Sequence, residues 1–306
     1  MFRETNIKKI VQYLLVIMCI GFGAGFLILF STGGISEIFH PDPANSQKIS
    51  EERLEKVTGI EEVEIEASSV DMNVVPADTG EVRAVLKGKF SNMRKPELQM
   101  YTEGSKLHIK VKITNGNKLL SSNANLVLNV QIPSSYANNL KIVSKSGDVT
   151  LERLKLKNLD FDLSSGDAIF ADLNIDQFKY DSSSGGLNGD NIITRNTVLH
   201  ISSGNIVIRK FEGDLKADTS SGDINVQYQA FKNNANIEVS SGDVVLSLPG
   251  NSEFRLNAHA SSGNIECKFP IIVTGEYKQN ELQGTVGKDN NKINVETNSG
   301  DIRIIK

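Results

Sequence analysis

The stretch SSGDINVQY, residues 220–228, decides the fold because the chain repeats it. SSGDAIF begins at Ser164 and SSGDVVL at Ser240, and each copy continues with alternating apolar residues. The intervals between the repeated glycines are 19, 19, 19, 18, 20, 21 and 37 residues, the last being close to two periods. A fixed period of this size indicates stacked repeats, in which each unit contacts its neighbours. The repeated glycines are Gly147, Gly166, Gly185, Gly204, Gly222, Gly242, Gly263 and Gly300.

Apolar residues keep fixed distances from these glycines. The residue two positions after each glycine is apolar in every copy, and the residue four positions after is apolar in all copies except Gly189. Alternation with period two indicates strands with one face in the core and one face in solvent. Each repeat is therefore expected to hold a strand, a tight turn and a second strand. The sequence predicts an all-β protein, a β-solenoid of repeats of roughly 19 residues.

The turn residues are predicted to have a structural role. Glycine adopts positive φ without steric cost, and the next residue is Asp in most copies and Asn in two. Asn preserves an Asx-type hydrogen bond to the turn backbone but lacks the charge of a calcium ligand, which favours the structural role. A ladder of bound cations is the alternative. The predicted turn residues besides the eight glycines are Asp148, Asp167, Asn205, Asp223, Asp243, Asn264 and Asp301.

The N-terminal segment predicts the compartment. Residues 10–30, IVQYLLVIMCIGFGAGFLILF, are 21 residues without a charge, long enough for one transmembrane helix. Arg3, Lys8 and Lys9 precede this segment, which places residues 1–9 in the cytoplasm and the rest outside the cell, at the cell membrane. Gly21 and Gly25 have the GxxxG spacing that allows two helices to form a homodimer, although small residues are also common in membrane helices.

Three segments follow the predicted helix. Residues 31–58 are expected to be a linker, because HPDPANSQ contains two prolines. Residues 59–139 are expected to form an irregular N-terminal β region, in which VEIEASSVDMNVVP resembles a repeat with Val70 in the glycine position. Residues 140–306 are expected to form the SSGD/SSGN-repeat solenoid. Whether residues 59–139 continue that solenoid is left open by the pattern.

Charge and cysteine content exclude several classes of protein. Without Arg3, Lys8 and Lys9 the 33 basic residues become 30, and without Glu4 the 37 acidic residues become 36, so the exported part carries −6. This charge disfavours nucleic acid and anionic membrane surfaces as partners. Cys19 and Cys267 are the two cysteines, which excludes a disulfide framework and a cysteine-based zinc site.

The residues that commonly carry chemistry are scattered. His108, His200 and His259 each lie between predicted inward-facing residues, so we expect them to face solvent. We therefore predict no catalytic residues, no cofactor and no metal site, and a protein that is not an enzyme. The alternative is a polysaccharide-acting β-helix enzyme, for which the candidate outward carboxylates are Asp160, Asp162, Glu238 and Glu266.

The chain resembles a bacterial β-strand-repeat family labelled "putative adhesins" of unknown function. The resemblance rests on the anchor, on the SSGD and SSGN turns and on the final NSGDIRII, residues 298–305. LiaG-type membrane-anchored envelope proteins belong to that family. The resemblance implies an extracytoplasmic repeat domain and supplies no catalytic residues. We expect non-catalytic interaction at the cell envelope with an envelope protein or a wall component, as an accessory to an envelope-stress response. Adhesion to a surface or glycan and a purely structural spacer role are the alternatives.

Overall fold

A computed structural model describes residues 46–91, 95–113, 123–274 and 278–306. These residues form 22 β-strands and no helix, so none of them forms a helix long and apolar enough to cross a membrane. The predicted transmembrane segment, with Gly21 and Gly25, and residues 31–45 of the predicted linker lie outside the described residues. The all-β prediction is confirmed for the described part of the chain.

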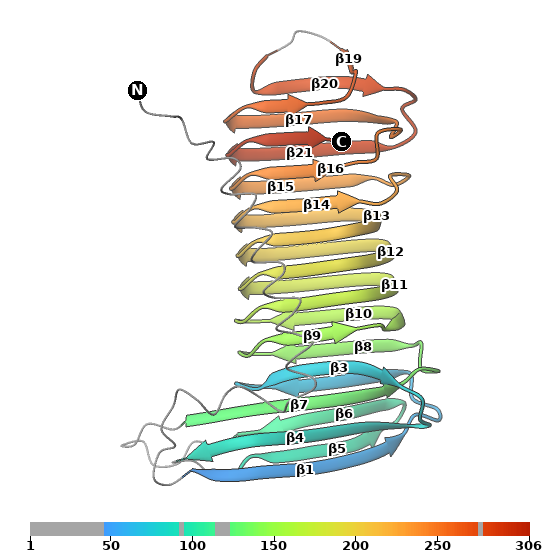
Figure 1. Ribbon diagram of the computed structural model, residues 1–306, viewed down its shortest axis with the longest axis vertical. Helices are drawn as coiled ribbons and strands as arrows, with labels where there is room; N and C mark the ends of the chain where they lie inside the picture. The colour runs from blue at the N-terminus through green and yellow to red at the C-terminus, as the bar shows by residue number, and fades with distance from the viewer. Residues whose placement is uncertain (1–45, 92–94, 114–122, 275–277) are drawn as a thin grey trace, which may run out of the picture. The chain divides into compact units, whose positions relative to one another are not determined.

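Residues 47–306 form one compact unit of stacked coils (Figure 1). Each coil has two strands that belong to two facing sheets, and we call these the first-strand sheet and the second-strand sheet. Three long bent strands contribute to both sheets: β11 (Ala168–Ser184), β12 (Leu187–Ser203) and β13 (Ile206–Ser221).

The parallel part of the first-strand sheet contains the following strands besides β11–β13: β6 (Lys106–Lys112), β2 (Glu62–Ala67), β8 (Asn139–Ser144), β10 (Lys155–Leu163), β15 (Ala235–Ser241), β21 (Lys292–Ser299) and β17 (Phe254–Ser262). The second-strand sheet contains the strands that follow them: β7 (Asn123–Pro133), β3 (Asp71–Ala77), β9 (Val149–Glu152), β14 (Ile224–Tyr228), β16 (Val244–Ser247), β22 (Ile302–Ile305) and β18 (Ile265–Cys267).

Antiparallel strands cover both ends of the stack. At one end β1 (Gln47–Lys56) pairs with β4 (Glu81–Ser91), β4 pairs with β7, and β5 (Glu97–Glu103) pairs with β6. At the other end β20 (Glu281–Val286) pairs with β17 and with the short β19 (Ile272–Val273). Edge strands need such protection, because an unpaired parallel coil would expose its backbone hydrogen-bonding groups.

The coils at both ends of the repeat array are inserted one level inward. The coil of β21 and β22 lies between the coil of β15 and β16 and the coil of β17 and β18. The coil of β2 and β3 likewise lies between that of β6 and β7 and that of β8 and β9. Gly300 therefore stacks between Gly242 and Gly263, whereas the sequence interval suggested a position beyond Gly263.

Two of the segments expected from the sequence need correction. Residues 47–56, expected in a linker, form β1, whose charged side chains suit an edge strand with one solvated face. Residues 62–77 are a regular coil in register with residues 139–151, so the repeat array continues into the region expected to be irregular. Val70 does take the glycine position, and positive φ moves to Ser69 (58°).

The core lies between the two sheets and is apolar. The inward columns predicted from the alternation are buried from Val63 to Ile304, apart from Cys267, which is half-buried. Aromatic rings, rare in the sequence, are concentrated here: Phe161 packs against Tyr180 with 5.3 Å between ring centroids, and Phe211 packs edge-on against Tyr228 at 5.1 Å. Such pairs add to the stabilisation that comes from their buried area.

The glycine corner requires residues without a Cβ. Gly222 has a φ of +133°, and a Cβ built on it would lie 2.1 Å from the backbone oxygen of Gly204 in the preceding coil. The Gly222 N–H donates to Ser241 O of the following coil. The corner backbone is therefore hydrogen-bonded to the following coil and in close contact with the preceding one. Both the backbone conformation and the close coil contact therefore exclude other residues here.

The Asp and Asn residues after the corner form a ladder between coils. The Asp243 N–H donates to Asp223 Oδ1 at 2.9 Å, and the Asp301 N–H donates to Asp243 Oδ1 at 2.8 Å. The expected Asx bond to the same turn is thus replaced by a bond to the neighbouring coil. The backbone N–H of Asn264 and the Arg303 guanidinium hold the pKa of Asp301 below its ordinary value. The resulting stability is present above the unfolded-state pKa and lost as the pH falls through the lower folded-state pKa.

A second corner on the opposite side of four successive coils uses residues other than glycine. Arg153, Asp172, Asn191 and Lys210 occupy it with φ between 53° and 57°. Asn191 donates from Nδ2 to Asp172 Oδ1 at 2.6 Å, which links adjacent coils there. Left-handed conformations are costly for residues with a Cβ and are retained where the surrounding structure fixes them.

Gly222→Val is expected to destabilise the fold by about 3 kcal/mol or more, because it combines positive φ with overlap on a neighbouring backbone. Thermal unfolding of the full-length protein, followed by circular dichroism, measures this. Gly250→Ala is the matched control, because nothing lies within 4 Å of a Cβ built there. Equal melting temperatures for the two variants would contradict the corner geometry.

Asp223→Ala and Asp223→Asn separate the hydrogen bond of the ladder from its charge. Alanine removes the acceptor for the Asp243 N–H and is expected to cost about 1 kcal/mol. Asparagine keeps an acceptor, as Asn205 does in the preceding coil where it accepts from the Asp223 N–H at 2.8 Å, so little change in stability is expected. Chemical denaturation at neutral pH measures the free energy of unfolding of both variants. Equal losses of stability would show that the charge of Asp223 matters and that its hydrogen-bond acceptor does not.

Candidate functional site

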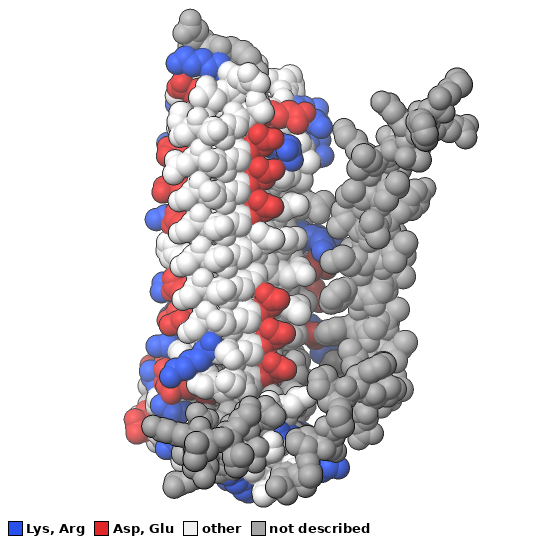
Figure 2. Space-filling view, turned by 90° about the vertical axis from the view of Figure 1, so that its left-hand side faces the viewer, with Lys and Arg blue, Asp and Glu red and all other residues white. Residues whose placement is uncertain are grey.

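A groove of about 640 Å³ lies on the outer face of the first-strand sheet beside the glycine corner. It crosses β10, β11, β12, β13, β15 and β21, and we call it the acid groove. Figure 2 shows acidic side chains in rows along the stack with neutral residues between them. The groove follows from the alternation of the strands, since residues on either side of an inward apolar residue point outward.

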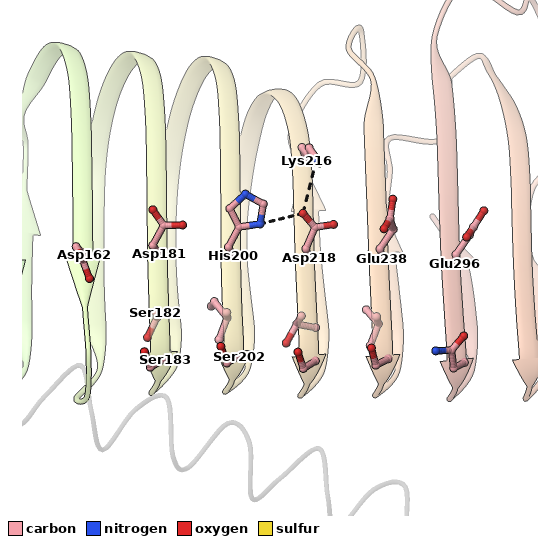
Figure 3. Close-up of a pocket in the computed structure, with 16 residues that line it drawn as sticks. Asp162, Asp181, Ser182, Ser183, His200, Ser202, Lys216, Asp218, Glu238 and Glu296 are labelled. Atoms are coloured by element: carbon pink, nitrogen blue, oxygen red, sulfur yellow. Dashed lines mark ion pairs between the residues drawn. The ribbon is translucent and has the colours of Figure 1, made fainter.

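One row of side chains in the groove is in direct cross-strand register, and we call it the acid column. Figure 3 shows its members side by side. Adjacent members on neighbouring parallel strands are about 4.8 Å apart. The acid column consists of Asp162, Asp181, His200, Asp218, Glu238 and Glu296.

The acid column places like charges next to one another. Asp218 pairs with His200 at 2.9 Å and with Lys216 at 3.8 Å, and Asp181 pairs with Lys179. Glu238 and Glu296, which are direct neighbours, form no ion pair or hydrogen bond with any described residue. Like charges directly opposite each other on adjacent strands destabilise a sheet. The fold therefore gains nothing from this pair.

A neighbouring column shows the arrangement that stability favours. Two residues before the acid column, Asp160 on β10 lies between Lys141 on β8 and Lys179 on β11. Opposite charges alternate there, as cross-strand pairing prefers. Because the acid column departs from this arrangement at Glu238 and Glu296, we take it as the candidate binding site.

Hydroxyl groups line the other side of the groove. Ser183, Ser202, Ser220 and Ser240 each follow the acid column by two residues and are exposed, and Asn298 takes this place on β21. Carboxylates accept hydrogen bonds from amines, and hydroxyls both donate and accept. The groove can therefore bind a ligand that carries positive charge and hydroxyl groups at intervals.

The described residues provide little for catalysis or for a metal. No group of three or more His, Cys, Asp or Glu side chains among them could hold a metal ion. Burial raises the pKa of the Cys267 thiol, which disfavours the nucleophilic thiolate. Burial also raises the pKa of Tyr180 to about 12, so its hydroxyl beneath the groove stays protonated at neutral pH.

Of the three histidines expected to face solvent, two do so. His200 lies in the groove and His259 faces solvent, but the prediction for His108 is wrong, since its exposed fraction is 8%. Tyr101 on β5 stacks on its ring at 5.0 Å, and Glu64 lies 2.8 Å from Nδ1. The sequence did not show that the hairpin of β5 and β6 would place Tyr101 over the outer face.

The predicted turn residues lie together along one edge of the stack, beside the acid groove. Of the four carboxylates weighed for an enzyme, Asp162 and Glu238 are in the groove, Asp160 is in the neighbouring column and Glu266 is on β18 of the other sheet. The acid column could have been found in the sequence, because an acidic residue recurs four positions before the glycine, as in Asp181, Asp218 and Glu296.

Glu238→Gln is expected to raise the melting temperature slightly, because it removes repulsion from Asp218 and Glu296 worth a few tenths of a kcal/mol. The gain should shrink as salt is added. Asp160→Asn is the matched control, since it removes a carboxylate that lies between two lysines and should lower the melting temperature. A stabilising effect of Asp160→Asn, or a loss in Glu238→Gln, would contradict this reading of the columns.

Comparison with known proteins gives the family and little more. Residues 60–305 match the Toastrack DUF4097 family. A "putative adhesin" from Bacteroides fragilis is 14% identical, with 85% of this chain and 97% of that chain covered and a TM-score of 0.49. A "putative cell adhesion protein" from Clostridium sporogenes is 16% identical, with 84% and 99% covered and a TM-score of 0.29.

A "putative lipid binding protein" from Parabacteroides distasonis is 13% identical, with 86% of this chain and 98% of that chain covered and a TM-score of 0.37. No curated protein matches the chain. The match over residues 60–305 confirms the resemblance to a β-repeat family of unknown function, whereas membership of its LiaG-type branch stays a prediction.

Proposed function

Because the chain belongs to the Toastrack DUF4097 family, we propose that it is a non-catalytic β-repeat protein that acts outside the cytoplasm. Its acid groove binds a cationic ligand that also carries hydroxyl groups. The observation that supports this most is the neighbouring pair of Glu238 and Glu296, to which none of the residues that the structure describes supplies a cation. Such a ligand would supply the missing positive charge.

The proposed location is the outer side of the cell membrane. It rests on the uncharged residues 10–30 and the basic residues before them. A single anchor would hold the repeat unit close to the membrane, where wall components and the outer parts of membrane proteins are within reach. Pairing of two anchors through Gly21 and Gly25 would present two grooves together.

Two biological roles fit this proposal, and both need only binding. An accessory of an envelope-stress response would hold a membrane protein through a basic segment, whereas an adhesin would hold a surface or an amino-bearing glycan. Crosslinking in living cells with the full-length protein separates them. Recovery of one particular membrane protein supports the stress role, and recovery of wall material alone supports adhesion.

A polysaccharide-acting enzyme receives less support from the groove. Glycosidases need one carboxyl that holds a proton and one that does not, and differences in environment separate the two. Glu238 and Glu296 are both exposed on adjacent strands, so burial does not distinguish them. A binding surface, unlike a glycosidase site, needs no difference in environment between its two carboxylates.

Chitosan oligomers, which carry an amine and hydroxyl groups on each sugar, are expected to bind the full-length protein in isothermal titration. The matching acetylated chitin oligomers, which lack the charge, should not bind. Binding should weaken as the salt concentration rises, because exposed charges are screened. Glu238→Gln with Glu296→Gln should weaken chitosan binding at least about tenfold, the effect of losing charge-assisted hydrogen bonds.

The control variant for this titration is Glu266→Gln, which removes a carboxylate from β18 in the other sheet. It is expected to bind chitosan as the unaltered protein does. Equal binding of the charged and acetylated oligomers, or full binding by the double glutamine variant, would refute the assignment of the acid groove.

A further inference from the structure

A second, smaller pocket of about 260 Å³ lies on the same sheet face near the end of the stack. It lies where β17, β20 and β21 meet, and the acid groove does not include it. The described polar side chains that line it are nitrogen donors and one hydroxyl, and none of them is a carboxylate: Arg255, Lys292, Asn257, Asn294, Gln283 and Thr274.

The two cations end a column that is made mainly of amides from Asn139 to Asn234, with Asp214 on β13 as the carboxylate among them. Asn158 Nδ2 donates to Asn139 Oδ1 at 2.7 Å, and Asn196 Nδ2 donates to Gln177 Oε1 at 3.2 Å. Stacked amides of this kind satisfy one another from coil to coil. The column continues through Asp214, whose Oδ1 accepts from the Asn234 N–H at 2.7 Å, and then through Asn234, whose Oδ1 accepts from the Lys292 N–H at 3.0 Å. Beyond that point its side chains are no longer amides.

At the end of this column two like charges lie side by side. Arg255 and Lys292 are direct partners in the register of β17 and β21. Neither side chain forms an ion pair or hydrogen bond with any described residue. Arg303, by contrast, pairs with Asp301 at 2.9 Å and Asp243 at 3.6 Å. Adjacent unpaired cations weaken the sheet, so an anion from outside would offset this repulsion.

We propose that this pocket, which we call the basic pocket, binds a phosphate group on a hydroxyl-bearing ligand. Arginine offers a planar pair of N–H donors that fits phosphate oxygens, and the nearby lysine adds a second positive charge. Asn257, Asn294 and Gln283 supply amides that can bond the remaining oxygens and neighbouring hydroxyls. Two cations match a phosphate, with its greater charge, better than a carboxylate. This inference goes beyond the proposed function, because it uses neither the residues nor the ligand charge of the acid groove.

Anion binding at this pocket runs against the net charge of the exported part, which is −6. The overall field therefore repels anions, and binding must come from the local geometry. A phosphate monoester of glycerol in solution and the headgroup of phosphatidylglycerol share the required chemistry, a phosphate next to hydroxyl groups. The experiment distinguishes these two sources.

The test uses the full-length protein in neutral detergent, titrated with inorganic phosphate and with glycerol 3-phosphate by isothermal calorimetry. We expect saturable binding of glycerol 3-phosphate that weakens about tenfold or more in Arg255→Gln with Lys292→Gln. Arg209→Gln, which alters an exposed arginine on β13, is the control and should bind normally. Glu238→Gln should also bind normally, which keeps this result separate from that of the acid groove.

Asn257→Asp gives a second way to close the pocket, since it places a carboxylate beside the two cations while changing little volume. Circular dichroism verifies that each variant keeps its strands. Flotation with phosphatidylglycerol vesicles, compared with neutral phosphatidylcholine vesicles, then assigns the source. Binding to vesicles supports a lipid headgroup, and binding to glycerol 3-phosphate alone supports a soluble or polymeric phosphate. No phosphate binding, or unchanged binding in both kinds of variant, overturns the proposal.

Discussion

The close contact between corner glycines of successive coils is the constraint on which the rest of the structure depends. At each of these corners the backbone passes so near the preceding coil that a Cβ would overlap its carbonyl oxygen, as between Gly242 and Gly222 at 2.1 Å. This contact fixes both the turn and the register of the two strands that leave it. Because each coil with such a glycine turns at the same corner, residues at equal distances from it fall into columns. The columns then decide which side chains meet.

Stacking similar side chains in a column stabilises the inner face of the strands and destabilises the outer face where the side chains are charged. Inside, similar apolar side chains stack well, and the chain accordingly has Phe161, Phe170 and Tyr180 in mutual contact. Outside, stacking of similar charges is unfavourable, so a stable surface alternates them or uses amides. The acid column and the basic pocket depart from that rule at different places on one sheet. Such local departures from the arrangement that favours stability are expected at functional sites.

Much of the fold could be predicted from the sequence, because its determinants are local. Glycine spacing and alternation identify the corner and the inward columns without knowledge of which coils are neighbours. The position of Gly300 could not be predicted, since coil interfaces are chemically alike and the hairpin of β19 and β20 sets the order. The second corner was also hidden, because Arg153, Asn191 and Lys210 share no side-chain chemistry. The acid column follows from the register, and Glu238 and Glu296 are neighbours only because a coil is inserted.

The insertion of the coil formed by β21 and β22 is therefore the central claim, and a disulfide tests it directly. Glu238→Cys with Glu296→Cys, in a chain with Cys19→Ser and Cys267→Ser, places two thiols on adjacent strands about 4.8 Å apart, within disulfide reach. Glu238→Cys with His259→Cys places them two strands apart, about 9.6 Å, which is too far. The account predicts that mild oxidation joins the first pair and leaves the second reduced. Efficient joining of the second pair and not the first would show that the coils stack in chain order and would contradict the account.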